Sequence, residues 1–298
     1  MTDSTLPSHL TPGPLLEGRT AVVTGGAGAV ADAICRSFAA HGASLVVADV
    51  DAKRTAATVS AVEALGAKAV GFVADLTAAG AVEELSRAAL DAFGQVDILI
   101  NALGEHLAFG GPFENSSEEQ WQALYEVNLL ATLRCSHAFI PGMKERGWGR
   151  IINFSSVEGI RSMPSGAVYT AFKGAIDSFT KSLGVDLAHY GIRANAIAVD
   201  KTRSYQVNHY RMPAEYDPFI PVWIPAGRFG EGTDVASVAL FLASELGAWV
   251  VGQTIPADGG TLAAGGWYRT PTRWTNSPLL AQYLEDPEVT KRRPPNLR

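Results

Sequence analysis

The sequence of 298 residues has little cysteine, no excess of positive charge and no long hydrophobic run. Cys35 and Cys135, its two cysteines, lie in apolar helical patterns, so we expect buried free thiols and a reducing compartment rather than a disulfide. The net charge of −6 argues against a nucleic-acid surface. No apolar run approaches the roughly 18 residues of a membrane span, and the polar start shows no secretory signal. We therefore expect a cytoplasmic protein that binds neither nucleic acid nor membrane.

Two kinds of catalytic site are also missing from the sequence. The six histidines are scattered without paired ligand spacing, so we expect no metal site. Ser156 does not lie in a G-x-S-x-G elbow, which disfavours a serine hydrolase. The 47% hydrophobic and 18% charged residues are instead typical of an ordinary folded protein rather than a disordered one.

Short apolar strands alternate with helical patterns along most of the chain. This alternation predicts an α/β fold: a single Rossmann-type, doubly wound parallel sheet of about seven strands flanked by helices. The strands are expected at Thr20–Thr24, Ser44–Ala48, Ala69–Ala74, Val96–Ile100, Arg150–Phe154, Arg193–Ala198 and near Gln253–Ile255, and the helices at Ala29–His41, Ala52–Leu65, Ala81–Phe93, Ser117–Met143, around Tyr169, and Thr233–Leu246. We expect a flexible segment at 1–15, the main domain at 16–262 with a lid at about 204–229, and a C-terminal extension at 263–298.

The first strand runs into a glycine turn and then a helix, which is the arrangement that a phosphate site requires. The turn begins at Thr24-Gly25 and reaches the helix through Gly28, Ala29 and Val30. Glycines let the backbone approach a pyrophosphate, and the amides and dipole of the helix N-terminus stabilise its charge. Asp49 ends the next strand, where a carboxylate would bind the adenosine ribose and repel a 2′-phosphate. This favours NAD over NADP; the alternative is that Asp49 only caps the following helix.

Tyr169 and Lys173 are four residues apart in a helical pattern, so both can face one cavity. A nearby cation favours phenolate over phenol and would lower the pKa of Tyr169 from about 10. Tyr169 is thus a candidate acid/base near neutral pH. The alternative is a tyrosine at the edge of the core beside a solvated lysine.

Together these motifs resemble the classical short-chain dehydrogenase/reductase family from about Leu16 to Leu262. The matching stretches are the turn at Thr24–Ala31, Asp75-Leu76, Asn101–Gly104, Asn128, Ser156 thirteen residues before Tyr169, the Tyr169-xxx-Lys173 pair, Gly227–Gly230, Gly252–Thr254 and Asp258–Gly260. The resemblance implies an NAD-dependent enzyme that interconverts a secondary alcohol and a ketone. It also implies a homotetramer or homodimer formed through the long helices and the last strand.

The resemblance implies a role for each matching residue. Tyr169 would transfer the hydroxyl proton while hydride passes between the substrate carbon and NAD. Lys173 would lower the pKa of Tyr169 and hold the nicotinamide ribose, Ser156 would bind the substrate oxygen, and Asn128 would support a water for proton release. The implied cofactor-binding residues are Thr24, Gly25, Gly28, Ala29, Val30, Asp49, Asp75, Leu76, Asn101, Tyr169, Lys173, Thr202 and Ser204, the last matching the family's nicotinamide-amide threonine.

The chain departs from the family pattern at three places. Ala29 and Ala31 replace glycines of the phosphate turn, and NALG at Asn101–Gly104 replaces NNAG. Val199-Asp200 replaces a Pro-Gly after the sixth strand, and the charge of Asp200 could favour an oxidised, cationic nicotinamide ring. The altered turn keeps a second class open, in which the chain is a dinucleotide-binding protein without catalysis.

The substrate is less defined by the sequence. Aromatic side chains and a methionine in the expected lid suggest an apolar or cyclic alcohol; they are Tyr205, Tyr210, Met212, Tyr216, Phe219 and Trp223. Charged and polar residues that could instead favour a polyol, sugar or hydroxy acid are Glu105, His106, Glu158, Arg161, His209 and Arg211, although any of them could lie on the surface.

The C-terminal extension is too aromatic for a solvated linker. Its rings are Trp267, Tyr268, Trp274 and Tyr283. We expect much of it to dock, either across a neighbouring subunit, where it could lie beside the active site, or on its own subunit. The basic end at Lys291–Arg293 and the prolines after it are expected to form a disordered surface.

Overall fold

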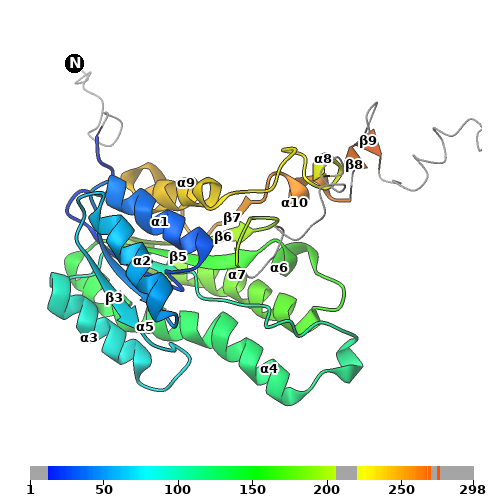
Figure 1. The fold of residues 1–298 in the computed structure, drawn as a ribbon, viewed down its shortest axis with the longest axis horizontal. Coiled ribbons are helices and arrows are strands. Elements are labelled where there is room, and N and C mark those ends of the chain that lie inside the picture. Colours follow the sequence, from blue (N-terminus) through cyan, green and yellow to red (C-terminus); the bar gives the residue numbers. More distant parts are fainter. Residues whose placement is uncertain (1–12, 206–219, 267, 270–273, 276–298) are drawn as a thin grey trace, which may run out of the picture.

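The computed structural model describes residues 13–205, 220–266, 268–269 and 274–275 (Figure 1). Within these residues the fold is built on one sheet of seven parallel strands in the order β3-β2-β1-β4-β5-β6-β7. Their bounds are β1 Thr20–Thr24, β2 Ser44–Asp49, β3 Ala69–Val73, β4 Ile98–Asn101, β5 Gly149–Ser156, β6 Ile192–Val199 and β7 Thr254–Ala257. The predicted doubly wound parallel sheet is confirmed. The order reverses between β1 and β4, the switch point at which such sheets bind ligands.

Helices cover both faces of the sheet. Helices α1, α2 and α9 pack on one face and α3, α5 and α7 on the other (Figure 1). The described helices are α1 Ala29–Ala40, α2 Ala52–Glu63, α3 Ala81–Phe93, α4 Glu118–Tyr125, α5 Ala131–Arg146, α6 Glu158–Arg161, α7 Ala167–Leu187, α8 Ile220–Trp223, α9 Gly232–Ala243 and α10 Thr261–Ala264.

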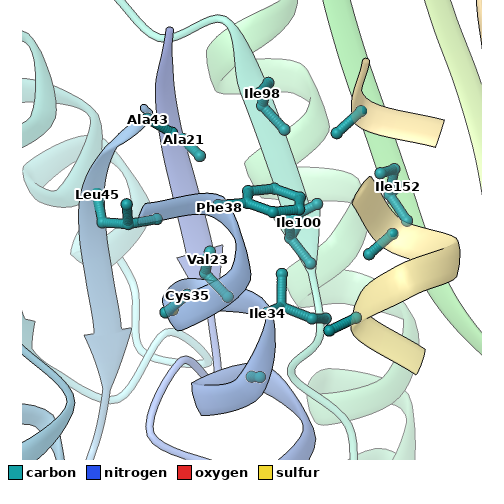
Figure 2. Packing of buried hydrophobic residues seen from close by; sticks show 14 of the residues in the cluster. Ala21, Val23, Ile34, Cys35, Phe38, Ala43, Leu45, Ile98, Ile100 and Ile152 are labelled. Carbon is teal, nitrogen blue, oxygen red and sulfur yellow. The ribbon is translucent and has the colours of Figure 1, made fainter. Parts of the chain in front are cut away.

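The core forms because successive strand residues point to opposite faces. Ile98 and Ile100 of β4 belong to the cluster under α1 and α9, whereas Leu99 between them belongs to the cluster under α3 and α5. In Figure 2, Phe38 of α1 lies among the isoleucines of β4. Phe38 is fully buried, and both cysteines are buried free thiols as expected.

The predicted helix at Ser117–Met143 is divided in the structure. Ser117 caps α4 through a capping box with Gln120, and a π turn at Glu126–Leu130 separates α4 from α5. The region is helical throughout, as predicted, but the π turn, which the sequence pattern did not predict, divides it into two α-helices. The π turn contains the buried Asn128. Such turns are frequent at functional sites.

Part of the predicted lid and tail can be described. Residues 206–219 of the lid lie outside the described residues, as do 267, 270–273 and 276–298 of the extension. Among the rest, α8 lies within the predicted lid, α10 crosses the predicted boundary at 262, and a two-stranded antiparallel ladder pairs Tyr268–Arg269 with Trp274–Thr275. In the described part of the chain no helix is both long and apolar enough to cross a membrane.

Candidate active site

Ser156, Tyr169 and Lys173 meet at the carboxyl end of the sheet. Ser156 is the last residue of β5, and the side chains of Ser156 and Tyr169 share a hydrogen bond. Lys173 lies one turn after Tyr169 on α7, with its Nζ 5.7 Å from the centre of the Tyr169 ring. The Lys173 side chain is buried and donates from Nζ to the carbonyl oxygen of Phe154 at 3.1 Å. The two side chains therefore lie close together, as their spacing predicts.

The predicted effect of Lys173 on the Tyr169 pKa is wrong for this structure. Burial raises the pKa of Tyr169, the hydrogen bond from Ser156 opposes the rise, and the carboxylates of Glu158 and Asp200 add to it. Burial also lowers the pKa of Lys173, to about 8. The sequence shows the spacing of the two residues but not how far both are removed from water, and desolvation disfavours each charged form.

Asn128 fixes the chain that follows β4. Its Oδ1 accepts from the Glu105 amide at 3.1 Å, while its Nδ2 donates to the carbonyls of Glu105 and Leu124 at 2.8 and 3.1 Å. Gly104 lies against both polar groups: a Cβ there would be 2.8 Å from Lys173 Nζ and 3.1 Å from Asn128 Oδ1. Glycine at 104 thus lets the main chain approach the ammonium group. Only the family resemblance singles out Gly104, and no sequence pattern predicts this contact.

The glycine turn, which is the expected pyrophosphate cradle, packs closely on the protein around it. Gly25 has φ +62°, and a Cβ on it would come within 3.1 Å of the Leu103 main chain. A Cβ on Gly26 would lie 2.8 Å from the Val23 carbonyl. Gly28 caps α1, so the first amides of that helix, from Ala29 and Val30, border the turn. The alanine methyl at the third glycine position, Ala31, is buried in the core without interrupting α1.

Asp49 supports this turn directly. Its Oδ2 accepts from the Ala27 amide at 3.1 Å and its Oδ1 from the Asp51 amide at 3.0 Å. The cap of α2 is Asp51, whose Oδ1 accepts from the Arg54 amide, so the alternative role of Asp49 as that cap is wrong. The carboxylate of Asp49 is therefore held at the end of β2 beside the phosphate turn, where its charge would meet a ribose or repel a phosphate.

The other predicted cofactor residues divide into two groups. Thr24 and Asn101 use their side chains inside the protein: Thr24 Oγ1 accepts from the Leu103 amide, and Asn101 Nδ2 donates to Asn153 and Ser136. The Oδ1 of Asn101 is buried and has no hydrogen-bond partner among the described residues, so this side chain can still accept a hydrogen bond. Leu76 belongs to the core under α3 and α5. Asp75 is exposed and accepts from Thr77, Thr202 donates to the Asp200 carbonyl, and Ser204 is half-buried just before the undescribed lid residues.

A small hollow of about 30 Å³ lies against Tyr169. Phe109, Phe113, Trp121, Leu124 and Val168 line it together with Tyr169, and Ser116, Gln120 and Ser165 add polar groups. Phe113 and Trp121 stack with their ring centres 5.4 Å apart. These rings were not predicted as site residues, because they fall in a segment without a motif. The lid residues Tyr210, Met212, Tyr216, Phe219, His209 and Arg211 lie outside the described residues.

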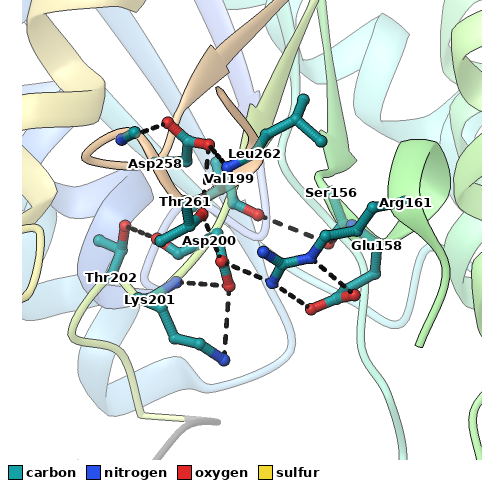
Figure 3. Close-up of polar contacts among 11 residues, drawn as sticks. Ser156, Glu158, Arg161, Val199, Asp200, Lys201, Thr202, Asp258, Thr261 and Leu262 are labelled. Atoms are coloured by element: carbon teal, nitrogen blue, oxygen red, sulfur yellow. Dashed lines mark hydrogen bonds and ion pairs between the residues drawn. The ribbon is translucent and has the colours of Figure 1, made fainter. Parts of the chain in front are cut away.

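A network centred on Asp200 joins three strand ends (Figure 3). Asp200 follows β6, and its Oδ2 accepts from Arg161 at 2.8 Å and from Thr261 at 2.7 Å. Arg161 also binds Glu158, its neighbour on α6, at 2.9 Å. Asp258 after β7 accepts from Thr261 and from the Leu262 amide. The expected free negative charge of Asp200 is thus largely neutralised by Arg161 and Lys201.

Replacing Arg161 by methionine is expected to lower the free energy of unfolding by about 1–2 kcal/mol, because the buried Asp200 carboxylate loses a charged partner. This expected loss in stability is smaller than for a fully buried ion pair, because a third of the Arg161 side chain is exposed. Urea unfolding measures the change. Arg36→Met is the control: Arg36 pairs with Asp32 on the surface of α1, and its loss should cost less than about 0.5 kcal/mol. Equal losses would contradict a special role for the network.

Comparison with known proteins agrees with this arrangement. The family model described as enoyl-(acyl carrier protein) reductase matches residues 25–261. A 3alpha-hydroxysteroid dehydrogenase from Mediterraneibacter gnavus is 35% identical over 82% of this chain and 97% of its own. A short-chain reductase protein, NovJ, from Streptomyces niveus is 32% identical over 80% of this chain and 92% of its own. The crystal structure of levodione reductase superposes with a TM-score of 0.78 at 29% identity, covering 84% of this chain and 99% of that one. The chain is a member of the short-chain dehydrogenase/reductase family of oxidoreductases.

Proposed function

We propose that this oxidoreductase interconverts a secondary alcohol and a ketone with NAD, and that the substrate is apolar or cyclic. The observation that carries the proposal is the contact of Ser156 with Tyr169 beside the buried Lys173, at the carboxyl end of the sheet. The glycine cradle and Asp49 support a nicotinamide dinucleotide as cofactor. When bound, this cofactor accepts or supplies the hydride.

The protein's own groups handle the proton and the substrate oxygen. In this proposal Ser156 binds the oxygen, and Tyr169 takes its proton in oxidation or returns it in reduction. Lys173 places an ammonium group beside the phenol. The side chain of Asn128 is already bonded to the Glu105 and Leu124 main chain. A water for proton release would therefore have to be held by main-chain groups of the π turn, with Asn128 fixing the turn.

The rings beside Tyr169 support the substrate class, because Phe109, Phe113 and Trp121 place aromatic surface next to the proposed acid/base. The resemblance to a 3alpha-hydroxysteroid dehydrogenase supports a cyclic alcohol in the same way. A polyol, sugar or hydroxy acid is the second candidate, favoured by the charged Glu158, Arg161 and Asp200 close to Ser156. A dinucleotide-binding protein without catalysis is the third. A homotetramer or homodimer and a cytoplasmic location remain predictions, as do the domain boundaries at 16 and 262.

A substrate screen separates these candidates. The purified protein is incubated with NAD and monocyclic secondary alcohols, polyols and hydroxy acids, and NADH absorbance is followed. The proposal expects the highest kcat/KM among the monocyclic alcohols. A preference for polyols or hydroxy acids would support the second candidate. Binding of NAD without turnover of any alcohol, or of any ketone with NADH, would support the third.

Replacing Asp49 by asparagine is expected to shift cofactor preference toward NADP. Asparagine can keep the acceptor for the Ala27 amide while it removes the charge that would repel a 2′-phosphate. We expect the NADP/NAD ratio of kcat/KM to rise about tenfold, equivalent to about 1.4 kcal/mol. Asp51→Asn is the matched control, because asparagine also caps helices well. The NADP/NAD ratio of kcat/KM of this variant should equal that of the wild type. A wild-type enzyme that prefers NADP would contradict our interpretation of Asp49.

A further inference from the structure

The imidazole of His106 lies against the ring of Tyr169. His106 stands two residues after Gly104, on the segment that leaves the carboxyl end of β4. The two ring centres are 5.2 Å apart and the ring planes meet at 71°, an edge-to-face contact. Tyr169 therefore has Ser156 at its hydroxyl and His106 beside its ring. If the substrate oxygen binds at Ser156, the rest of the substrate lies near the His106 imidazole.

One nitrogen of His106 has no hydrogen-bond partner in the part of the chain that the structure describes. This nitrogen is Nε2, and it is buried. Buried polar atoms in folded proteins are nearly always hydrogen-bonded, and an exception calls for an explanation. An imidazole that served only to pack on Tyr169 could be replaced by an apolar ring without leaving a nitrogen unpaired. The position beside the proposed proton donor indicates that the missing partner is part of the substrate.

The segment that carries His106 is held in place. Glu105, the residue before it, is fixed by Asn128 through both its amide and its carbonyl. The carbonyl of His106 accepts from the Phe109 amide at 3.3 Å. Leu107 and Ala108 between them have φ of +55° and +54°, the left-handed region that non-glycine residues rarely adopt. Such conformations persist where the surroundings determine them, and they are common at ligand-binding sites.

We propose that His106 binds a second oxygen of the substrate, so that the preferred substrate is a cyclic secondary alcohol carrying a further hydroxyl or carbonyl group. This deepens the proposed function and rests on it. A neutral imidazole suits either group: Nε2 accepts from a hydroxyl when Nδ1 carries the proton, and Nε2–H donates to a carbonyl when it does not. The aromatic rings beside Tyr169 would contact the ring of the substrate, while Ser156 and His106 would fix its two oxygens and hence its orientation.

The test compares substrates that differ in one group. Cyclohexanol, the 2-, 3- and 4-methylcyclohexanols and the cyclohexane-1,2-, 1,3- and 1,4-diols are oxidised with NAD, and kcat/KM is measured from NADH absorbance. Each methylcyclohexanol matches a diol in shape but lacks the second oxygen. In the wild-type enzyme we expect at least one diol to exceed its methyl counterpart about tenfold or more, well above the twofold advantage of having two oxidisable hydroxyls.

Two variants assign that preference to His106. His106→Phe keeps an aromatic ring against Tyr169 and removes the nitrogen, so the diol preference should fall to about twofold while cyclohexanol keeps its kcat/KM within about threefold. His106→Gln restores a hydrogen-bonding group and should recover part of the preference. Urea unfolding of both variants shows whether they fold like the wild type. If His106→Phe does not fold, the kinetics of His106→Gln serve as the readout.

The possible outcomes separate the two proposals. If the wild type oxidises the monocyclic alcohols without preferring any diol, or if His106→Phe lowers kcat/KM equally for all substrates, His106 only packs on Tyr169 and its proposed role is wrong. The proposed function would still stand in both cases. If the wild type turns over none of these alcohols with either NAD or NADP, the proposed function fails, and the role of His106 fails with it.

Discussion

Tyr169→Phe is expected to lower kcat for alcohol oxidation by about 10³-fold, within the range of 10²–10⁴ that a positioned acid/base contributes. The variant keeps the ring that contacts His106 and Lys173 but loses the hydroxyl that bonds Ser156. KM for NAD should change little, because the phosphate cradle and Asp49 are untouched. Steady-state kinetics by NADH absorbance gives both quantities.

The same residue should determine the pH dependence. Because burial raises the pKa of Tyr169, the phenol is protonated at neutral pH in the free enzyme, which suits the donor needed for ketone reduction. Oxidation requires the phenolate, so its kcat/KM should rise with pH up to about pH 8, above which the loss of the Lys173 charge opposes the rise. The reverse reaction should be flat near neutrality and fall above about pH 8, where Lys173 loses its charge.

Tyr190→Phe is the control for the loss of a phenol hydroxyl. Tyr190 lies in the short helical turn after α7, away from the sheet edge that carries the site, and contacts His189 and Lys144 through its ring. Its kinetics and pH profile should equal those of the wild type. Unchanged turnover in Tyr169→Phe would show that another group transfers the proton.

Gly104→Ala is expected to lower kcat/KM about 100-fold, equivalent to about 2.7 kcal/mol of transition-state stabilisation. A Cβ at 104 would stand 2.8 Å from Lys173 Nζ, closer than real Cβ contacts allow, so the ammonium group must move. The end of a lysine side chain moves more easily than main chain does. We therefore expect a loss of only about 1 kcal/mol in the free energy of unfolding. The variant should thus separate the position of Lys173 from the stability of the fold.

Gly13→Ala serves as the control for this substitution, because no atom lies within 4 Å of the Cβ position at Gly13. Its kinetics and its urea midpoint should match those of the wild type. A titration of NAD binding to Gly104→Ala adds a second readout, since the proposed role of Lys173 includes holding the nicotinamide ribose. Normal kcat/KM in Gly104→Ala would mean that the ammonium position is not critical.

The sheet and the helices that position the site could be predicted because their signals are local. The run TAVVT is apolar and β-branched, and Gly42 with φ +90° follows the C-cap of α1 where the sequence predicts the helix to end. The π turn could not be predicted. One inserted residue leaves the apolar spacing of a helix almost unchanged, so Asn128 appeared to be an isolated amide within a continuous helix.

The proximity of Tyr169 and Lys173 could be predicted because their spacing is short and regular, whereas their electrostatics could not. Asp200 pairs with Arg161, 39 residues earlier, and with Thr261, 61 residues later. No sequence periodicity relates residues so far apart. The raised pKa of Tyr169 likewise depends on burial and on the carboxylates of Glu158 in α6 and Asp200 after β6. Local pattern thus indicates which groups are present, and tertiary structure decides their charge.

The position of β1 in the middle of the sheet sets the order in which this site can form during synthesis. β1 pairs with β2 soon after both emerge from the ribosome, but its other neighbour, β4, follows only at Ile98–Asn101. At a synthesis rate of about 5–20 residues per second, the edge of β1 that later pairs with β4 stays unpaired for several seconds. The bond from Leu103 to Thr24, which joins the cofactor turn to the catalytic half, can form only after that wait. Tyr169 and Lys173 come later still, so a nascent chain acquires its nucleotide cradle well before it acquires an acid or base.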